Sequence, residues 1–340
     1  MGRANKFLYC SSGKEIRVTE YLIDIPMCAY NHEKYIARAI EGVINQRTNF
    51  SYRLILGEDC STDATRSIIE SYLSKYPEKM KVFFHEKNIG AFENSKILFK
   101  ACTSKYVALC DGDDYWCDEN KLQKQVDFLE ANLDYAICFH RVYLLEGQKK
   151  LEWSDLNRSD KEETYTIRDL AKQNIIHTPS VIFRNGLFGE LPTWFSESPV
   201  GDYVLHMLNA KHGLIKYFPE PMAVYRINSG GMWSGQARPV MTKKMIKLLS
   251  LLMKEDFEEE VIASIRHNWR ADVNAYLQML FPNDLATFTE ELKIFAKEDE
   301  TILYDWATDY YPNFIKDILA SGAYKVANKV ATIKHRLIKK

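Results

Sequence analysis

Residues 106–116 read YVALCDGDDYW, an apolar run that leads directly into three carboxylates, Asp111, Asp113 and Asp114. The apolar run predicts a short buried strand. Packing like charges together is unfavourable unless a cation neutralises them. Mg²⁺ or Mn²⁺ uses few protein carboxylates and completes its shell with phosphate oxygens and water, so the segment predicts a metal site. The alternative is an acidic turn in which Asp113 or Asp114 helps to cap the next helix.

The strand before this acidic segment is the fourth of a series. Earlier apolar runs predict strands at residues 21–28, 52–57 and 81–85. Helical spacing of apolar residues predicts helices between and after these strands. They are expected at 32–45, in the segment that follows residue 63 and ends at residue 76, at 92–102 and at 119–132. Strands that alternate with helices at this spacing imply an α/β protein with a parallel, doubly wound sheet.

Polar residues follow each of these strands at its carboxyl end. They are residues 29–31, Glu58 and Asp59, residues 88–90, and residues 111–114. In doubly wound sheets ligands bind beyond the carboxyl ends of the strands. The four clusters therefore predict one ligand site at one edge of the sheet.

The bulk composition disfavours several classes of protein. The 340 residues carry a formal net charge of −1, whereas a nucleic-acid-binding protein usually shows a basic excess, so no nucleic-acid partner is expected. The seven cysteines form no Cys-x-x-Cys pair, which disfavours a zinc site or disulfide framework and favours a reducing cytoplasm. No apolar stretch approaches the roughly 20 residues that cross a bilayer, and the N-terminus lacks the apolar run of a signal peptide. We therefore expect a cytoplasmic protein.

Four segments together resemble the inverting family 2 glycosyltransferases, which have the GT-A fold. The segments are Pro26 to Asn31 (PMCAYN), Glu58 to Asp63 (EDCSTD), Asn88 to Gly90 (NIG) and Asp111 to Trp116 (DGDDYW). Their order and spacing resemble that family's nucleotide-sugar signature over about residues 20–135, and a looser likeness continues to about 235. The resemblance implies a mixed, mostly parallel sheet flanked by helices, with a helical C-terminal region.

The resemblance also implies roles for the residues that bind the nucleotide-sugar donor. These residues are Pro26, Tyr30, Asn31, Glu58, Asp59, Asn88, Asp111 and Gly112. Tyr30 and Asp59 would hold the base, uracil or thymine, and Asp111 would contact the ribose or the metal. Asp113 would ligate the Mg²⁺ or Mn²⁺ that bridges the diphosphate. From the residues alone, Tyr30 could instead cover the sheet edge, and Glu58 and Asp59 could cap the next helix.

A second set of residues concerns the transfer step. Asp202 in Gly201-Asp202-Tyr203-Val204-Leu205 resembles the family's catalytic base, although a helix N-cap is the alternative. Residues 225–234 resemble a loop that closes over the diphosphate. Many family members have histidine where this chain has Asn228. Asparagine is a weaker ligand of transition metals, so either the metal site is more suited to Mg²⁺ or Asn228 binds phosphate instead. Candidates for the acceptor side are Trp116, His177, Thr178 and Trp233.

The sequence changes character after about residue 236. We predict a glycosyltransferase domain at 1–236, with a donor half at 20–135 and an acceptor half at 136–236, followed by a helical region at 237–340. Residues 325–340 contain no acids and form a basic amphipathic pattern. Such a helix can lie on an anionic membrane, which would place the enzyme peripherally on the inner face. Alternatively, its apolar stripe packs on the protein or on another subunit of a homo-oligomer.

The predicted function is inverting transfer of a sugar from a UDP- or dTDP-sugar to a hydroxyl of a glycan or lipid-linked acceptor, in surface polysaccharide or glycoconjugate synthesis. Three other functions are alternatives to sugar transfer. A sugar nucleotidyltransferase would show a Gly-rich loop after its first strand, and an Asp-x-Asp phosphatase would have Thr or Val where this chain has Tyr115. A catalytically silent nucleotide-sugar-binding protein is the third alternative.

Overall fold

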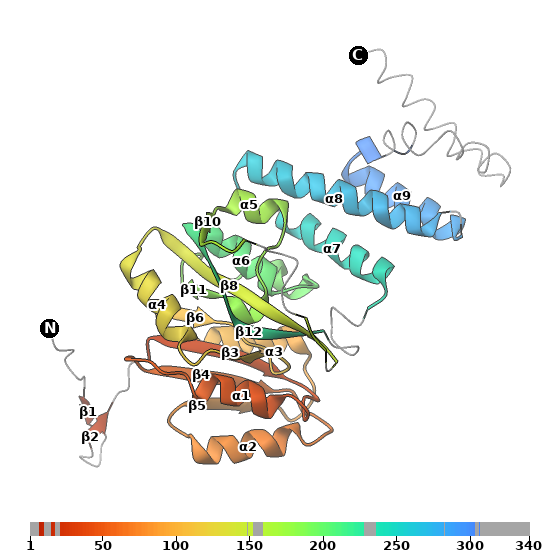
Figure 1. The fold of residues 1–340 in the computed structure, drawn as a ribbon. Helices are drawn as coiled ribbons and strands as arrows, with labels where there is room; N and C mark the ends of the chain where they lie inside the picture. The colour runs from red at the N-terminus through yellow and green to blue at the C-terminus, as the bar shows by residue number, and fades with distance from the viewer. Residues whose placement is uncertain are drawn as a thin grey trace. The chain divides into compact units, whose positions relative to one another are not determined.

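The structure, a computed structural model, describes residues 7–9, 15–17, 21–147, 149–151, 159–227, 236–281, 283–302 and 306. By its internal contacts the chain divides into two compact units, Met1–Gly235 and Gln236–Lys340. The first unit contains the sheet and the second is helical (Figure 1). Asn228, Trp233 and the basic segment 325–340, all singled out in the sequence, lie outside the described residues.

The first unit is built on a sheet with the strand order β10-β12-β8-β11-β6-β3-β4-β5, to which β7 and β9 add at β12 and β8. The strands are β3 (Ile23–Ala29), β4 (Tyr52–Glu58), β5 (Met80–Phe84), β6 (Tyr106–Ala108), β7 (Tyr115–Trp116), β8 (Tyr135–Glu146), β9 (Lys149–Leu151), β10 (Glu163–Tyr165), β11 (Ile182–Arg184) and β12 (Leu214–Ile227). A separate hairpin joins β1 (Phe7–Tyr9) and β2 (Glu15–Arg17).

The sheet is mixed and mostly parallel, as predicted. Strands β5, β4, β3 and β6 are mutually parallel, and β8 is parallel to β12. Strand β11 lies between β6 and β8 and is antiparallel to both, so β8 and β12 run in the same direction as the N-terminal strands. Consequently the carboxyl ends of both halves of the sheet face the same edge, which is where the predicted ligand site lies.

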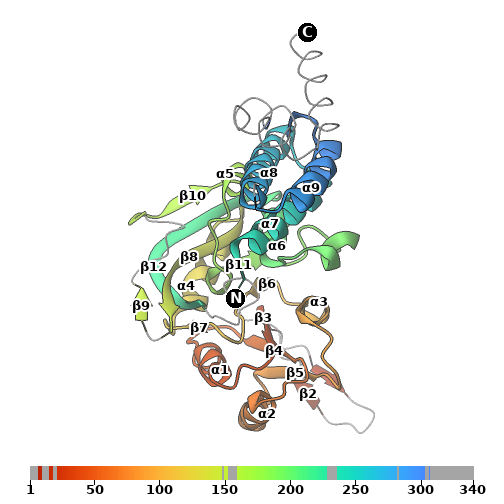
Figure 2. The ribbon, with the colours of Figure 1, turned by 90° about the vertical axis from the view of Figure 1, so that its right-hand side faces the viewer.

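Helices cover both faces of the sheet, which explains the continuous burial of the central strands. The helices of this unit are α1 (Ile36–Ile44), α2 (Thr65–Lys75), α3 (Ala91–Ala101), α4 (Lys121–Ala131), α5 (Ile167–Lys172) and α6 (Asp202–Ala210), with short 3₁₀ turns η1 (Thr178–Ser180) and η2 (Thr193–Glu197). Figure 2 shows α1 and α3 on opposite faces of β3 and β4. Strand β3 is buried at nearly every position for this reason.

A buried lysine lies at the start of α4. The Lys121 side chain is 0% exposed, and its Nζ lies 4.2 Å from the centre of the Trp116 ring. Within the described part of the chain this Nζ has no hydrogen-bond partner. Burial is the main reason why the pKa of Lys121 is lowered to about 7. Lys121 is therefore a stability cost that packing around it must offset.

Replacing Lys121 with methionine is expected to raise the free energy of unfolding at pH 7 by roughly 2–4 kcal/mol. In the unfolded chain, Lys121 binds its proton once the pH falls below the ordinary pKa of 10.5. In the folded protein it binds the proton only once the pH falls to about 7 or lower. The folded state therefore loses stability as the pH falls between these values, and the variant should lack this dependence. Urea unfolding at pH 7 and about pH 10 measures both effects.

The matched control is Lys124→Met, because Lys124 is 49% exposed and pairs with Asp118 at the surface. This change should alter stability by less than about 1 kcal/mol at either pH. Equal effects of the two methionine variants would contradict the account of Lys121.

The second unit consists of α7 (Arg238–Leu252), α8 (Glu259–Leu280) and α9 (Leu285–Glu298) within its described residues. Helix α8 packs on both α7 and α9. Its buried residues recur at helical spacing, at Val261, Ile265, Trp269, Val273, Tyr276 and Leu277. The helical C-terminal region predicted from the sequence is therefore confirmed. No helix among the described residues of the chain is long and apolar enough to span a membrane.

Candidate active site

The acidic segment after β6 contains one buried structural carboxylate and two that are partly buried. Asp114 is buried, and its Oδ1 accepts a hydrogen bond of 2.8 Å from the backbone N–H of Arg226 on β12. Asp111 and Asp113 are only partly buried. The segment thus connects the two halves of the sheet through Asp114 and leaves Asp111 and Asp113 as the candidate ligand-binding carboxylates.

Gly112 holds this segment against the end of β3. Its N–H donates to the carbonyl of Cys28 over 3.1 Å. A β-carbon at Gly112 would lie 2.8 Å from both this carbonyl oxygen and Nδ1 of His32. Only glycine therefore allows so close an approach, which explains why the acidic segment needs this residue between its carboxylates.

Asp111 is influenced by the charges of two other carboxylates, Asp113 in its own segment and Asp202 from a distant part of the sequence. Burial, followed by the charges of Asp113 and Asp202, raises the pKa of Asp111 to about 7. Asp202 begins α6, far from Asp111 in the chain. A bound cation would favour the ionised form of a carboxyl group whose ionisation is opposed in this way. The described residues contain no group of three or more His, Cys, Asp or Glu side chains arranged to hold a metal ion.

The loops after β3 and β4 fasten to each other. Asn31 adopts a left-handed conformation with φ 54°, and its Oδ1 accepts a hydrogen bond of 2.8 Å from the N–H of Thr62. The N–H of Asn31 in turn donates to Oγ of Ser61 over 3.1 Å. Asn31 therefore shapes the loop, and Tyr30 beside it is left 43% exposed, which fits a side chain available for stacking.

Asp59 orders the third loop of the site. Its two carboxylate oxygens accept hydrogen bonds from the N–H groups of Ile89 and Gly90, at 2.8 and 2.9 Å. Gly90 has a φ of 85°, and Asn88 Oδ1 also accepts from its N–H over 3.1 Å. Asp59 is 2% exposed. These contacts make Asp59 a support of the 88–90 turn, beside any contact that it makes with a nucleobase.

Two of the predicted donor-binding residues lie inside the protein. Glu58 is 0% exposed, and its Oε1 accepts from the N–H of Ser61 over 2.6 Å. Its Oε2 lies 3.6 Å from Arg66. Pro26 is buried in the middle of β3, opposite Ile55. Both placements favour a structural role over the ligand contact that the sequence suggested.

Asp202 is the first residue of α6, and both oxygens of its carboxyl group accept hydrogen bonds. Its Oδ2 accepts a hydrogen bond of 2.6 Å from Oγ1 of Thr178, and its Oδ1 accepts from the N–H of Tyr203 over 2.7 Å. Burial lowers the pKa of His177 and of His206 to about 4, although Asp202 opposes this in both. Both histidines are therefore neutral near pH 7, and Asp202 is not paired with an imidazolium.

The acceptor-side candidates separate into different surroundings. Trp116 is 3% exposed, and its indole N–H donates to the carbonyl of Pro179 over 2.9 Å. This placement favours a packing role over contact with an acceptor. The His177 ring lies 5.0 Å from the Tyr225 ring, and Thr178 contacts Asp202 directly. Of the described candidates, Thr178 contacts Asp202 and His177 precedes it in the chain. Trp116 is instead buried and holds the turn that contains Pro179.

Arg226 lies in the segment 225–234 that resembles the diphosphate loop, but no role of its own was predicted for it from the sequence. Its guanidinium lies 5.0 Å from the ring centres of both Tyr35 and Tyr115, and its backbone anchors Asp114. This contact places a positive charge beside the acidic segment. The signals in the sequence were the resemblance of residues 225–234 to that loop and the place of this arginine before the glycine pair Gly230 and Gly231.

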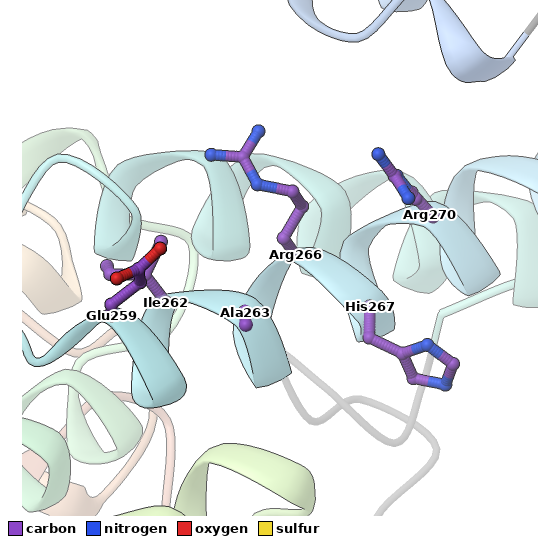
Figure 3. A pocket seen from close by; sticks show the side chains of 6 residues that line it. All are labelled: Glu259, Ile262, Ala263, Arg266, His267 and Arg270. Atoms are coloured by element: carbon purple, nitrogen blue, oxygen red, sulfur yellow. The ribbon is translucent and has the colours of Figure 1, made fainter.

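The second unit carries a hollow of about 390 Å³ on one side of α8. Figure 3 shows the side chains that line it, which are Glu259, Ile262, Ala263, Arg266, His267 and Arg270. They all come from one helix, and Arg270 is already paired with Asp299 at 2.7 Å. None of the predicted site residues belongs to this hollow.

Comparison with known proteins agrees with the predicted family and fold. Residues 24–190 match the family model described as Glycosyl transferase family 2. The uncharacterized protein Rv1520 of Mycobacterium tuberculosis is 38% identical over 215 residues, which cover 62% of this chain and 60% of that protein. The putative teichuronic acid biosynthesis glycosyltransferase TuaG of Bacillus subtilis is 33% identical over 108 residues, covering 32% of this chain and 42% of TuaG.

A solved structure shares the architecture at low sequence identity. S. aureus TarS 1–349 in complex with UDP-GlcNAc superimposes with a TM-score of 0.62 and 19% identity, covering 83% of both chains. At this identity the likeness concerns the fold. The expected GT-A type of sheet is confirmed by it together with the family match.

Proposed function

Residues 24–190 of this chain belong to glycosyl transferase family 2, and we propose that the chain is an inverting, metal-dependent enzyme that moves a sugar from a UDP- or dTDP-sugar to an acceptor hydroxyl. The observation that carries this proposal is that hydrogen bonds link Asp202 to the acidic segment, from Thr178 to Asp202 and from Trp116 to the carbonyl of Pro179. In agreement with this placement, the charges of Asp113 and Asp202 both oppose the ionisation of Asp111 and raise its pKa. A base must lie beside the donor's anomeric carbon, so it must lie near the group that holds the diphosphate.

Asp202 acts as the general base in this proposal. The acceptor oxygen attacks the anomeric carbon from the face opposite the diphosphate, and its proton passes to Asp202 as the bond to the diphosphate breaks. A single displacement inverts the configuration at that carbon. The neutral His177 and His206 support this role, because neither provides a cation that would compete for the carboxylate.

Asp111 and Asp113 are the residues that would hold Mg²⁺ or Mn²⁺. Two partly buried carboxylates that repel each other form a hard oxygen donor set, which fits either ion, with phosphate oxygens and water as the remaining ligands. When bound, the cation supplies positive charge to the leaving diphosphate. Asn228, as a ligand of the metal or the phosphate, remains part of the proposal.

Tyr30, Asn31, Asp59 and Asn88 border the pocket for the base and ribose in this proposal. The complex of TarS with UDP-GlcNAc supports a uridine nucleotide as the first donor to test. The name of TuaG supports an acceptor in surface polysaccharide synthesis. The proposal also includes a cytoplasmic location, with residues 325–340 in contact with the inner face of the membrane, and self-association. It divides the chain into a transferase domain at 1–236 and a helical region.

A thermal-shift panel of UDP-, dTDP- and GDP-sugars, with and without Mn²⁺ or Mg²⁺, tests the donor. One nucleotide is expected to raise the melting temperature in the presence of metal, because a ligand at 100 times its Kd stabilises the folded state by about 2.7 kcal/mol. A shift of roughly 4–8 °C should follow. No shift with any nucleotide at millimolar concentration would refute the transferase proposal. A shift without turnover of any acceptor would favour the silent binding protein.

A further inference from the structure

The turn that precedes β11 contacts the proposed base directly. Thr178 begins η1, and its Oγ1 donates a hydrogen bond of 2.6 Å to Oδ2 of Asp202. The other oxygen of this carboxylate accepts from the N–H of Tyr203. The two donors come from different segments of the chain. Together they determine both the position of the Asp202 carboxylate and its rotation about the bond to the β-carbon.

The turn itself is held by two buried side chains from the donor half. The Trp116 indole donates to the carbonyl of Pro179 over 2.9 Å, and the Gln125 amide donates to the carbonyl of Ser180 over 3.0 Å. Gln125 is 0% exposed. These bonds are made inside the protein, where a lost partner would leave a carbonyl unsatisfied, so they hold the turn rigidly.

Trp116 lies in β7, two residues after Asp114 in the chain. The segment that contains Asp111 and Asp113 is therefore connected, through Trp116 and Pro179, to the turn that contains Thr178. Contacts of this kind fix the distance and orientation between a supporting group such as Thr178 and the residues that carry out the reaction.

We propose that Thr178 is the positioning residue for Asp202, and that Trp116 and Gln125 hold its turn at a set place relative to the acidic segment. This inference rests on the proposed function of Asp202. It replaces the contact between Thr178 and an acceptor that the sequence suggested. The hydroxyl orients one oxygen of the base toward the acceptor and leaves donor binding to other residues.

The test compares Thr178→Val with Thr178→Ser. Release of UDP from UDP-GlcNAc, or of the diphosphate from whichever panel donor binds, is followed with water as acceptor. Thr178→Val is expected to lower kcat about 10- to 100-fold through loss of a hydrogen bond to a charged group. The donor KM and the donor-induced thermal shift should stay unchanged. Thr178→Ser keeps the hydroxyl and should recover most of kcat.

The control is Thr301→Val, which removes a similar threonine–aspartate hydrogen bond of 2.7 Å, to Asp299, from the second unit. Wild-type kcat in Thr178→Val, alongside an inactive Asp202→Asn, would overturn the positioning role while sparing the proposed function. Equal losses in the valine and serine variants would also overturn it. Full activity of Asp202→Asn would instead remove the proposed function.

A crystal structure of Thr178→Val gives a readout that does not depend on activity. Without the Thr178 hydroxyl, the Asp202 side chain is expected to leave its present rotamer or to occupy more than one. An unchanged, fully ordered Asp202 would overturn it.

Discussion

Asp202→Asn is expected to lower the rate of sugar transfer by roughly 100- to 10,000-fold, the range that general base catalysis contributes. The amide has nearly the same size as the carboxylate and can still accept the hydrogen bond from Thr178. It cannot, however, take a proton from the acceptor hydroxyl. The loss should therefore appear in kcat, with metal-dependent donor binding retained.

The measurement is diphosphate release with the donor identified by thermal shift, together with that shift itself. A suitable control is Asp284→Asn, because Asp284 caps α9 in the second unit by accepting from the N–H of Thr287. Asparagine is as good an N-cap as aspartate, so this control should behave as wild type. If Asp202→Asn transfers sugar at the wild-type rate, another residue must be the base.

Much of the fold could be predicted because the first half of the chain alternates strand and helix without interruption. The strand predicted at residues 21–28 is observed at Ile23–Ala29, and the one at 52–57 is observed at Tyr52–Glu58. Apolar runs bounded by polar loops give a strong signal where a sheet is covered on both faces. The gathering of polar loops at one edge then followed from the parallel arrangement.

The contacts within the site could not be predicted, because they depend on the register between distant strands. Trp116 follows the acidic residues and was expected near the acceptor. However, it pairs with Ala223 on β12, and this pairing directs its indole into the core. Likewise, the bond from Thr178 to Asp202 joins a 3₁₀ turn to a helix, and no local pattern records it.

Glu58 and Asp59 illustrate a related limit. Glu58 is the last residue of β4 and Asp59 is the first residue after it, and their side chains contact different segments. Glu58 is buried against Ser61, and Asp59 accepts two bonds from the 88–90 turn. From sequence the pair was expected to bind the donor or to cap the next helix. In the structure both carboxylates accept hydrogen bonds from backbone N–H groups of nearby loops. Sequence alone does not distinguish such a structural carboxylate from one that binds a ligand.

Asp113→Asn should lower transfer at least about 1000-fold, since a cation at a transferring phosphoryl or diphosphate group contributes several kcal/mol to the transition state. The variant should also lose the metal-dependent part of the nucleotide thermal shift. Asn is a neutral oxygen ligand, and with Asp114 buried against Arg226, Asp111 alone would have to hold the cation. Titration of the nucleotide shift with Mn²⁺ or Mg²⁺ measures the loss.

The same substitution should stabilise the protein in the absence of metal. Asp113 is one of the charges that oppose the ionisation of Asp111, so removing it relieves repulsion inside the cluster. With a chelator present, the variant is expected to melt about 1–3 °C above wild type. An acidic turn that merely caps a helix predicts the reverse, because loss of a capping or dipole-facing charge destabilises. A gain in metal-free stability together with a lost metal response would therefore identify a cation site, and a loss of stability with an unchanged metal response would identify a turn.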